Sequence, residues 1–293
     1  MTESTQPDGG SPARSLRQGA PKASRAGRNL PAAIAVGVIL LSAVLLGLLL
    51  MPLAFVAIVT LFGVVGCWEV GRALGSTDID VPLMPLLAGA VAMPFSAYYG
   101  GSEALGFALA GTVLLILLWR VIEGAAGALR SVMASTFVAL WVPLLLSFAI
   151  LMFNEVDGAF KVATVLLLVV ANDTFGYLVG AFFGKHPMAP KISPKKSWEG
   201  FAGSVAGATV VGVLATVFLL QQPWWVGIPL AMATVAAATV GDLSESMVKR
   251  ELGIKDMSNL LPGHGGMMDR LDSVVFAVPV AYVLSVLLLP GAR

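Results

Sequence analysis

Residues 31–50 read PAAIAVGVILLSAVLLGLLL, a stretch without a single charged side chain. A helix of this length rises about 30 Å, which matches the hydrocarbon core of a bilayer. Pro31 suits the first turn of a helix, where its missing N–H has no partner to lose. A secretory signal carries a shorter apolar run of about 7–15 residues. The stretch therefore predicts a retained transmembrane helix.

Apolar stretches of similar length follow along the rest of the chain. Together with the first, the predicted spans are 30–50, 52–70, 81–99, 104–120, 131–152, 161–183, 201–220, 224–241 and 271–290. No segment shows the alternating ten-residue pattern of transmembrane barrel strands. We therefore expect an all-α integral membrane protein, a polytopic bundle of about nine transmembrane helices. Eight spans, or a re-entrant third segment, are the alternatives, because Pro82, Pro85 and Pro94 lie in that segment.

The composition agrees with this fold class. Hydrophobic residues make up 57% of the 293-residue chain and charged residues 12%, and the mean hydropathy is +0.88. A soluble domain has about 25% charged residues, so a soluble enzyme and a disordered chain are both excluded. A net charge of +1 provides no basic surface for nucleic acid, and we expect no such partner. The single Cys67 excludes an intramolecular disulfide and a cysteine-based zinc site.

The distribution of Lys and Arg predicts the orientation in the membrane. If the N-terminus is cytoplasmic, 16 of the 18 basic residues fall on the cytoplasmic side, and only Lys161 and Arg293 fall outside. Because cytoplasmic segments carry the excess of Lys and Arg, we predict a cytoplasmic N-terminus. Residues 1–29, polar and basic, are expected to form a disordered cytoplasmic tail, and residues 30–293 a single transmembrane domain.

The two longest polar connections of this arrangement, 184–200 and 242–270, are both predicted to be cytoplasmic. They hold most of the polar side chains outside the tail. We therefore place the active site at the cytoplasmic face of the bundle.

The segment that follows the eighth span carries a regular set of polar residues. Asp242, Glu245, Ser246 and Lys249 are spaced i, i+3, i+4 and i+7, so they share one face if the helix continues. A carboxylate, a hydroxyl and an ammonium on one face can bind a divalent cation together with a phosphate, since Mg²⁺ is held by one or two carboxylates plus substrate phosphates. The alternative is an ion-paired helix end with no ligand.

A glycine-rich segment leads into the ninth span. Three glycines surround His264, which allows backbone N–H groups to approach an anion. Asp269 and Asp272 follow on one helix face at the start of the span. Acids beside a bilayer are costly unless they are paired or bind metal, so we predict a Mg²⁺ site shared with Asp242. The alternative is a pair of acids that cap the helix. His264 is not expected to be a general base.

The connection 191–200 contains the adjacent Lys195 and Lys196, two hydroxyls and a Trp. The lysines are suited to neutralise phosphate. The alternative is a positive loop that only sets the topology.

A single acid, Asp173, falls within the sixth span. An Asp at a helix centre costs about 2.5–3.5 kcal/mol in insertion, which makes it a functional candidate, with a hydrogen bond between helices as the alternative. It shares a face with Gly176, Gly180 and Gly184. Such a stripe permits close helix packing, within the chain or between two copies, so a homodimer is one alternative.

Charges elsewhere are given no functional role. Glu69 and Arg72 are interpreted as an i, i+3 ion pair, and Glu123 and Arg130 as loop charges.

Residues 246–272 resemble the signature of the phosphatidate cytidylyltransferases, or CDP-diacylglycerol synthases. The matching positions are Ser246-x-x-Lys249-Arg250, Lys255-Asp256, Ser258, Pro262, His264-Gly265-Gly266 and Asp269-Arg270-x-Asp272. Asn172-Asp173 and residues 193–200 also resemble the family. Ser197 stands where many members have Thr, which keeps the hydroxyl. The likeness covers roughly residues 30–290.

The resemblance implies transfer of CMP from CTP to phosphatidate, giving CDP-diacylglycerol and pyrophosphate. Mg²⁺ would be required, and the protein would be a multi-pass protein of a bacterial-type plasma membrane that contacts membrane lipids. The implied catalytic residues are Asp242, Lys249, Asp269 and Asp272. The implied substrate-binding residues are Ser193, Lys195, Lys196, Ser197, Ser246, Arg250, His264, Gly265, Gly266 and Arg270. Asp242 and Asp269 would bind the metal, and Asp173 would bind a second cation or orient a lysine.

Three other functions are alternatives. The first is a CTP-dependent transferase that acts on another lipid phosphate, such as that of an isoprenoid ether lipid. The second is an ion-coupled transporter with Asp173 as the cation site, which is disfavoured because the polar groups gather at one face rather than at the midplane. The third is an inactive membrane scaffold. It is disfavoured because all the acidic and basic residues expected of an active site are present.

Overall fold

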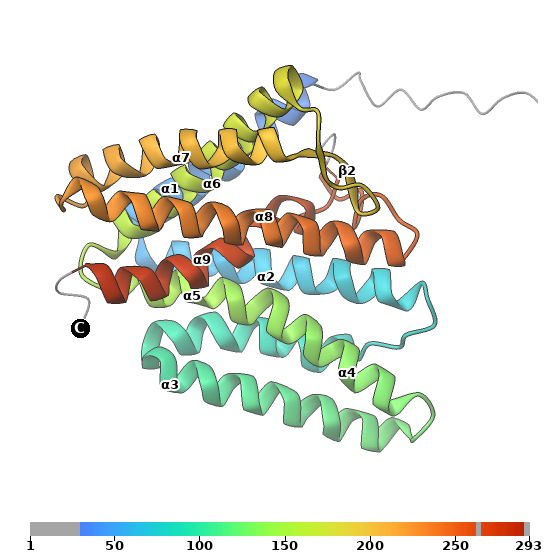
Figure 1. Cartoon of the computed structure of the whole chain (residues 1–293). Helices are drawn as coiled ribbons and strands as arrows, with labels where there is room; N and C mark the ends of the chain where they lie inside the picture. The colour runs from blue at the N-terminus through green and yellow to red at the C-terminus, as the bar shows by residue number, and fades with distance from the viewer. Residues whose placement is uncertain (1–29, 262–264, 290–293) are drawn as a thin grey trace, which may run out of the picture.

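The computed structural model describes residues 30–261 and 265–289, with side chains from residue 37 onward. Its elements are α1 (Leu30–Leu50), α2 (Pro52–Gly75), α3 (Leu83–Glu123), α4 (Ala128–Ala139), the π-helix η1 (Leu140–Leu144), α5 (Leu145–Phe153), α6 (Gly158–Phe183), β1 (Pro187–Ala189), β2 (Ser193–Ser197), α7 (Trp198–Phe218), the 3₁₀-helix η2 (Trp224–Val226), α8 (Gly227–Glu251) and α9 (Met268–Leu288). Helices dominate, as Figure 1 shows, and the predicted all-α class is confirmed. The antiparallel hairpin of β1 and β2 was not predicted.

The described residues include seven helices that are long and apolar enough to cross a membrane. Large apolar side chains such as Phe107 and Phe182 are 78% exposed on their outer surfaces, as expected where lipid replaces water. The chain is therefore a multi-pass membrane protein. One of the seven, Ala128–Phe153, joins α4, η1 and α5. Its π turn lies around Pro143, which has no N–H to donate.

The long helix α3 is divided by Gly101, whose φ of 64° and ψ of −155° are not helical. A straight helix of its 41 residues would be about 60 Å long, twice the thickness of the bilayer core. Instead the two limbs fold against each other (Figure 1), and a Cβ on Gly89 would overlap Thr112 of the second limb. The limbs correspond to the predicted spans 81–99 and 104–120. Pro94 lies inside the first limb without ending it.

Helices α2 and α8 extend furthest beyond the predicted spans. Helix α2 ends at Gly75 rather than near residue 70, and α8 ends at Glu251 rather than near residue 241. Residues 242–251 are therefore helical, as the i, i+4 spacing of Glu245 and Lys249 anticipated. The polar connection before α9 is shorter than the predicted 242–270 and spans residues 252–267.

The polar connections lie together in space. Those that follow α2, α3, α6 and α8 are at one end of the bundle, on the right in Figure 1, where α1 also begins. Their proximity places the hairpin β1–β2 beside the last turns of α8, which is where the candidate site forms.

Candidate functional site

Close packing of α6 on α7 builds one wall of the site. A Cβ on Gly176 would overlap Ser204 Oγ, and a Cβ on Gly200 would lie 2.9 Å from the Gly176 carbonyl oxygen. The hydroxyl of Ser204 donates to the carbonyl oxygen of Asn172 at 2.6 Å. The glycine stripe of α6 thus packs within the chain, as one of the two predicted alternatives had it, and does not argue for a homodimer.

A polar cavity of about 340 Å³ lies beside this packing, between α6, β2, α7 and α8. Ligand pockets are commonly about 300–1,000 Å³. Five of the predicted site residues line the cavity: Asp173, Lys195, Lys196, Ser197 and Asp242. Segments that are far apart in the sequence therefore supply both carboxylates and ammonium groups to one space.

An ion pair connects two walls of this cavity. Lys196 Nζ lies 2.5 Å from Asp242 Oδ2, and Ser246 Oγ donates to Asp242 Oδ1 at 3.3 Å. The side chains of Lys196 and Asp242 are 26% and 31% exposed. Partial exposure leaves both charges accessible to a ligand in the cavity.

Asn172 adds an oxygen that the sequence analysis did not single out as a ligand. Its Nδ2 donates to Asp173 Oδ1 at 2.9 Å. Its Oδ1 is buried and has no hydrogen-bond partner among the described residues, and Asn172 lines the cavity. A buried polar oxygen without a partner is costly, so a donor or a cation at this position would stabilise it.

A third acid approaches from α9. A Cβ on Gly241 would overlap the carbonyl oxygen of Asp272, so the glycine before Asp242 permits α8 and α9 to meet. Asp272 interacts electrostatically with Asp242 and Asp173, and its Oδ1 accepts from Ser273 N at 2.6 Å. Helices α6, α8 and α9 therefore each bring one acid to this region.

These oxygen donors fit a magnesium ion bound together with a phosphate. Mg²⁺ is held by one or two carboxylates plus substrate phosphates rather than by a cage of protein ligands. Within residues 30–261 and 265–289, no three His, Cys, Asp or Glu side chains come close enough to hold an ion by themselves. Asp242 and Asp173, with the unpaired oxygen of Asn172 beside them, suit a metal that a phosphate ligand completes.

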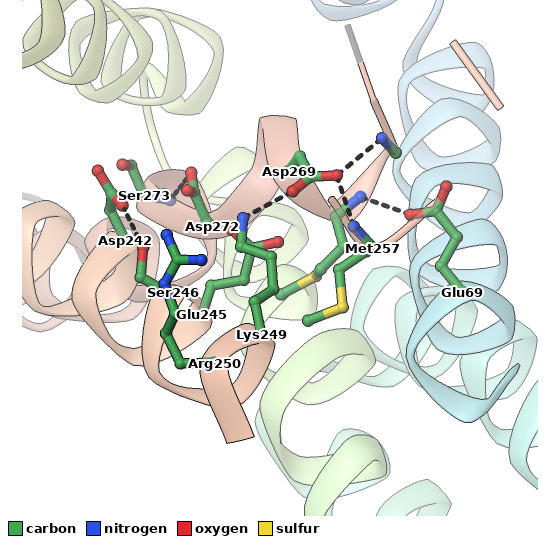
Figure 2. Close-up of polar contacts among 12 residues, drawn as sticks. Glu69, Asp242, Glu245, Ser246, Lys249, Arg250, Met257, Asp269, Asp272 and Ser273 are labelled. Atoms are coloured by element: carbon green, nitrogen blue, oxygen red, sulfur yellow. Dashed lines mark hydrogen bonds and ion pairs between the residues drawn. The ribbon is translucent and has the colours of Figure 1, made fainter. Parts of the chain in front are cut away.

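Asp269 is held in a second cluster, which Figure 2 shows. Its Oδ1 accepts from Lys249 Nζ at 2.7 Å. Its Oδ2 accepts from the backbone N–H groups of Met257 at 2.9 Å and Gly266 at 2.8 Å. Both oxygens are thus occupied, and Asp269 does not line the polar cavity. Asp242 instead contacts Lys196 and Ser246, and the metal shared by Asp269 and Asp242 stays a prediction.

Lys249 is held by two acids. Besides Asp269, its Nζ lies 2.9 Å from Oε2 of Glu245, which is fully buried. Glu245 was expected on the same helix face as Asp242 and Lys249, but it was not among the predicted site residues. The two carboxylates fix the lysine at the junction of α8 and α9.

Other predicted residues have local partners. Ser197 is the N-cap of α7, and its Oγ accepts from Gly200 N at 3.1 Å. Arg250 Nε donates to the Ile192 carbonyl oxygen at 3.3 Å, next to Ser193 at the start of β2. These contacts attach the hairpin to α7 and α8.

The glycine-rich segment is described only in part. Gly265 has a φ of 79° and pairs with Leu261 in an isolated bridge. His264 and Pro262 lie outside the described residues, so their predicted roles stay predictions.

Glu69 was missed by sequence analysis. It does not pair with Arg72, which stacks over Trp68 at 5.2 Å from the ring centroid. Glu69 instead accepts hydrogen bonds from Ser258, Met267 and Met268. The available signal was an acid in an otherwise apolar span, the same signal that singled out Asp173.

Glu199 was also missed. Its Oε2 accepts from the backbone N–H groups of Lys185 and His186, and its Oε1 lies 2.5 Å from His186 Nδ1. These bonds join the first turn of α7 to the start of the hairpin that carries Lys195 and Lys196. Glu123, expected to be a loop charge, pairs with Arg120 at 2.6 Å.

An apolar groove of about 350 Å³ is lined by residues of α1, α2, α5, α6 and α9. Among the residues that line it, only Arg270 is charged. Arg270 also interacts electrostatically with Asp173 of the polar cavity. Arg270 therefore lines the apolar groove and also acts on the charge of an acid in the polar cavity.

The fold and these two sites define a multi-pass membrane protein with a charged, ligand-sized cavity at one end and an apolar groove beside it. Residues 31–288 match the model of the cytidylyltransferase family. The phosphatidate cytidylyltransferase of Mycobacterium leprae is 42% identical over 294 residues, covering 94% of this chain and 93% of the relative. That of Mycobacterium bovis is 40% identical, covering 94% and 95%. That of Haemophilus influenzae is 48% identical over 130 residues, covering 42% of this chain.

The chain belongs to the cytidylyltransferase family, which confirms the resemblance seen in its sequence. It is a nucleotidyltransferase built into a membrane.

Proposed function

We infer that this protein transfers CMP from CTP to phosphatidate, giving CDP-diacylglycerol and pyrophosphate for phospholipid biosynthesis. The observation that carries this inference is the charged cavity beside the apolar groove, in a chain that matches curated phosphatidate cytidylyltransferases over 94% of its length. The lipid substrate has one phosphate and two acyl chains. A charged cavity, and an apolar groove that carries one arginine, offer a place for each.

In the reaction, a phosphate oxygen of phosphatidate attacks the α-phosphorus of CTP. The new bond joins that oxygen to the α-phosphorus, and the bond from the α-phosphorus to the bridging oxygen breaks, so that pyrophosphate leaves with the bonding electrons. The attacking phosphate is already ionised near pH 7, and no protein nucleophile or general base is needed. Such a transfer depends on positioning and on charge neutralisation.

Lys195 and Lys196, which line the polar cavity, would bind phosphate groups of CTP. A triphosphate entering there would replace Asp242 as the partner of Lys196. Arg270, which lines the groove and acts on the charge of an acid in the cavity, would bind the phosphatidate headgroup. One acyl chain would lie in the groove, where each buried methylene stabilises binding by about 0.8 kcal/mol.

Asp242 and Asp173, with Asn172 Oδ1, would hold Mg²⁺ on the triphosphate, and Asp272, which interacts electrostatically with both acids, would contribute negative charge. When bound, the metal neutralises charge that develops on the phosphate oxygens. Lys249 and Asp269 would act from the adjoining cluster by holding the start of α9 in place.

The two limbs of α3 are proposed to cross the membrane separately, which gives nine spans with α1 included. The basic connections then lie in the cytoplasm, together with the N-terminus, in the plasma membrane of a bacterium. The arrangement of the polar connections at one end of the bundle (Figure 1) supports this orientation.

The test is transfer of label from [α-³²P]CTP into the lipid phase by the purified, detergent-solubilised protein, with phosphatidate and Mg²⁺. We expect transfer by the wild type and by Glu103→Gln, a matched control at an exposed acid of α3, and none by Asp242→Asn or in EDTA. Failure of the wild type with phosphatidate, but transfer to another lipid phosphate such as an isoprenoid ether lipid, would refute the proposed acceptor. Failure with every lipid phosphate would refute the proposed function.

A further inference from the structure

Glu69 lies in α2, far in the sequence from every residue of the two clusters above, and is 1% exposed. No lysine or arginine pairs with it among the described residues. Within the part of the chain that the structure describes, its carboxylate accepts hydrogen bonds from donors in one other region. Burying a carboxylate costs free energy unless hydrogen-bond donors are held in place around it. The contacts of Glu69 with its donors therefore have a specific structural role.

All three donors belong to the connection 252–267 and the first turn of α9. Glu69 Oε1 accepts from Ser258 Oγ at 2.6 Å and from Met267 N at 2.9 Å. Its Oε2 accepts from Met268 N at 2.8 Å. Backbone N–H groups at the start of a helix have no partner within the helix. A carboxylate from another helix thus caps α9.

Gly266 makes this approach possible. A Cβ at this position would lie 2.7 Å from Glu69 Oε2 and 2.9 Å from Oε1. Any side chain there would push the carboxylate away from the helix start. The glycine of the predicted phosphate-binding segment is therefore needed for a contact with α2.

Glu69 and Asp269 hold the same segment from two sides, as Figure 2 shows. At one end of the segment Asp269 binds Met257 N and Glu69 binds the next residue, Ser258. At the other end Asp269 binds Gly266 N and Glu69 binds Met267 N. The two carboxylates thus bind both Met257–Ser258 and Gly266–Met267, and Asp269 continues the connection to Lys249.

We propose that Glu69 is a positioning residue for cytidylyl transfer, anchoring on α2 the residues Ser258, Met267 and Met268, whose placement orients Asp269, Lys249 and Arg270. This proposal rests on the proposed function. The proposed CTP cavity is built by α6, β2, α7 and α8, whereas the hydrogen bonds of Glu69 within the described residues go to Ser258, Met267 and Met268. Loss of the anchor therefore misplaces the start of α9 while the CTP cavity stays intact.

The test variant is Glu69→Gln, which keeps the size of the side chain but turns an NH₂ group toward a backbone N–H. We expect kcat to fall about 10- to 100-fold, the range for supporting contacts behind a site, with the KM for CTP changed less than about twofold. Gly266→Ala should lower kcat similarly, and the double variant should be no worse than the poorer single variant, because both remove one contact. Ser258→Ala, which removes one bond of three, should have a smaller effect and provides a variant that folds if the others do not.

A second measurement does not depend on the reaction. The rate of tryptic cleavage at the exposed Lys255 of the purified protein should rise at least about tenfold in Glu69→Gln, as the segment opens locally, and stay at the wild-type rate in Glu103→Gln. Unchanged cleavage overturns the anchoring role. Faster cleavage with normal kcat, or a lowered kcat matched by a raised KM for CTP, overturns the positioning role. A wild type without transfer activity refutes the proposed function and the positioning role with it, whereas the anchoring is still decided by the cleavage rates.

Discussion

Replacing Asp269 by asparagine is expected to destabilise the protein, whereas the same change at Asp242 is not. Asp269 is 6% exposed, and it accepts one bond from Lys249 and two from backbone N–H groups. An asparagine keeps one carbonyl oxygen, directs an NH₂ group toward donors and leaves the lysine with Glu245 alone. Asp242 is 31% exposed and has Lys196 and Ser246 as partners.

The expected losses of stability differ because Asp269 is buried and Asp242 is partly exposed. Breaking a buried ion pair costs about 3–5 kcal/mol, and the remaining pair with Glu245 favours the lower value, about 3 kcal/mol, for Asp269→Asn. At about 2 °C per kcal/mol for a chain of this size, Tm should fall by about 6 °C. A partly exposed pair contributes less than about 1 kcal/mol, so Asp242→Asn should shift Tm by under about 2 °C. Both variants should lose at least about 100-fold in turnover.

The assay combines thermal unfolding of the purified protein in detergent with the CTP transfer assay, and Glu103→Gln is the control for both. Tm should fall in Asp269→Asn but stay near the wild-type value in Asp242→Asn. A wild-type Tm for Asp269→Asn would refute its role as a buried clamp. Near-normal turnover by Asp242→Asn would refute its place in the metal and phosphate site.

Four further outcomes are expected. Lys196→Ala should raise the KM for CTP about tenfold or more, since a hydrogen bond to a charged group contributes about 1.5–3 kcal/mol. The exposed control Lys185→Ala should leave this KM unchanged. An unchanged KM for Lys196→Ala would mean that the hairpin lysines only set the membrane topology. Gly176→Val should lower the stability by about 1–3 kcal/mol, because α7 must move away, and a normal Tm would contradict the close packing. Ala149→Phe should narrow the apolar groove and reduce kcat/KM about 100-fold for long-chain phosphatidate, at about 0.8 kcal/mol per displaced methylene. The kcat/KM for a short-chain substrate, and that of the lipid-facing control Val210→Phe, should stay near the wild-type value. Equal losses on long-chain and short-chain substrates would refute the placement of the acyl chain in the groove. Chelation with EDTA should stop transfer, and Mg²⁺ should restore it; full activity without divalent metal would refute the metal site.

Much of the fold followed from local properties of the chain. Long uncharged stretches predict membrane helices because a bilayer leaves no other partner for backbone N–H and C=O groups, and the helices lie where those stretches are. The helix ends were less predictable. Helix α8 continues past its apolar part to Glu251, since pairs such as Glu245 with Lys249 stabilise helix in a polar setting. The hairpin β1–β2 was missed because its short strands have no strong pattern.

The candidate site was predicted as a set of residue types, and its division into two clusters was not. Asp173, Lys196 and Asp242 were expected near one another, and all three line the cavity. Asp269 shares its motif with Asp272, yet its oxygens bind the segment before α9. Spacing on one helix indicates which residues share a face, but it does not reveal which face another helix covers.

By itself, the sequence determined the membrane class, the family and most of the charged residues of the site, because hydropathy and motif spacing are carried by neighbouring residues. The tertiary structure alone decided that the glycines of α6 pack on α7 within the chain, that Arg270 is the charged residue lining an apolar groove, and that Glu69 caps α9 across nearly 200 residues of sequence. These contacts depend on how helices pack against one another. Packing brings together residues that are far apart in the chain, and the sequence spacing of such residues does not predict that they meet.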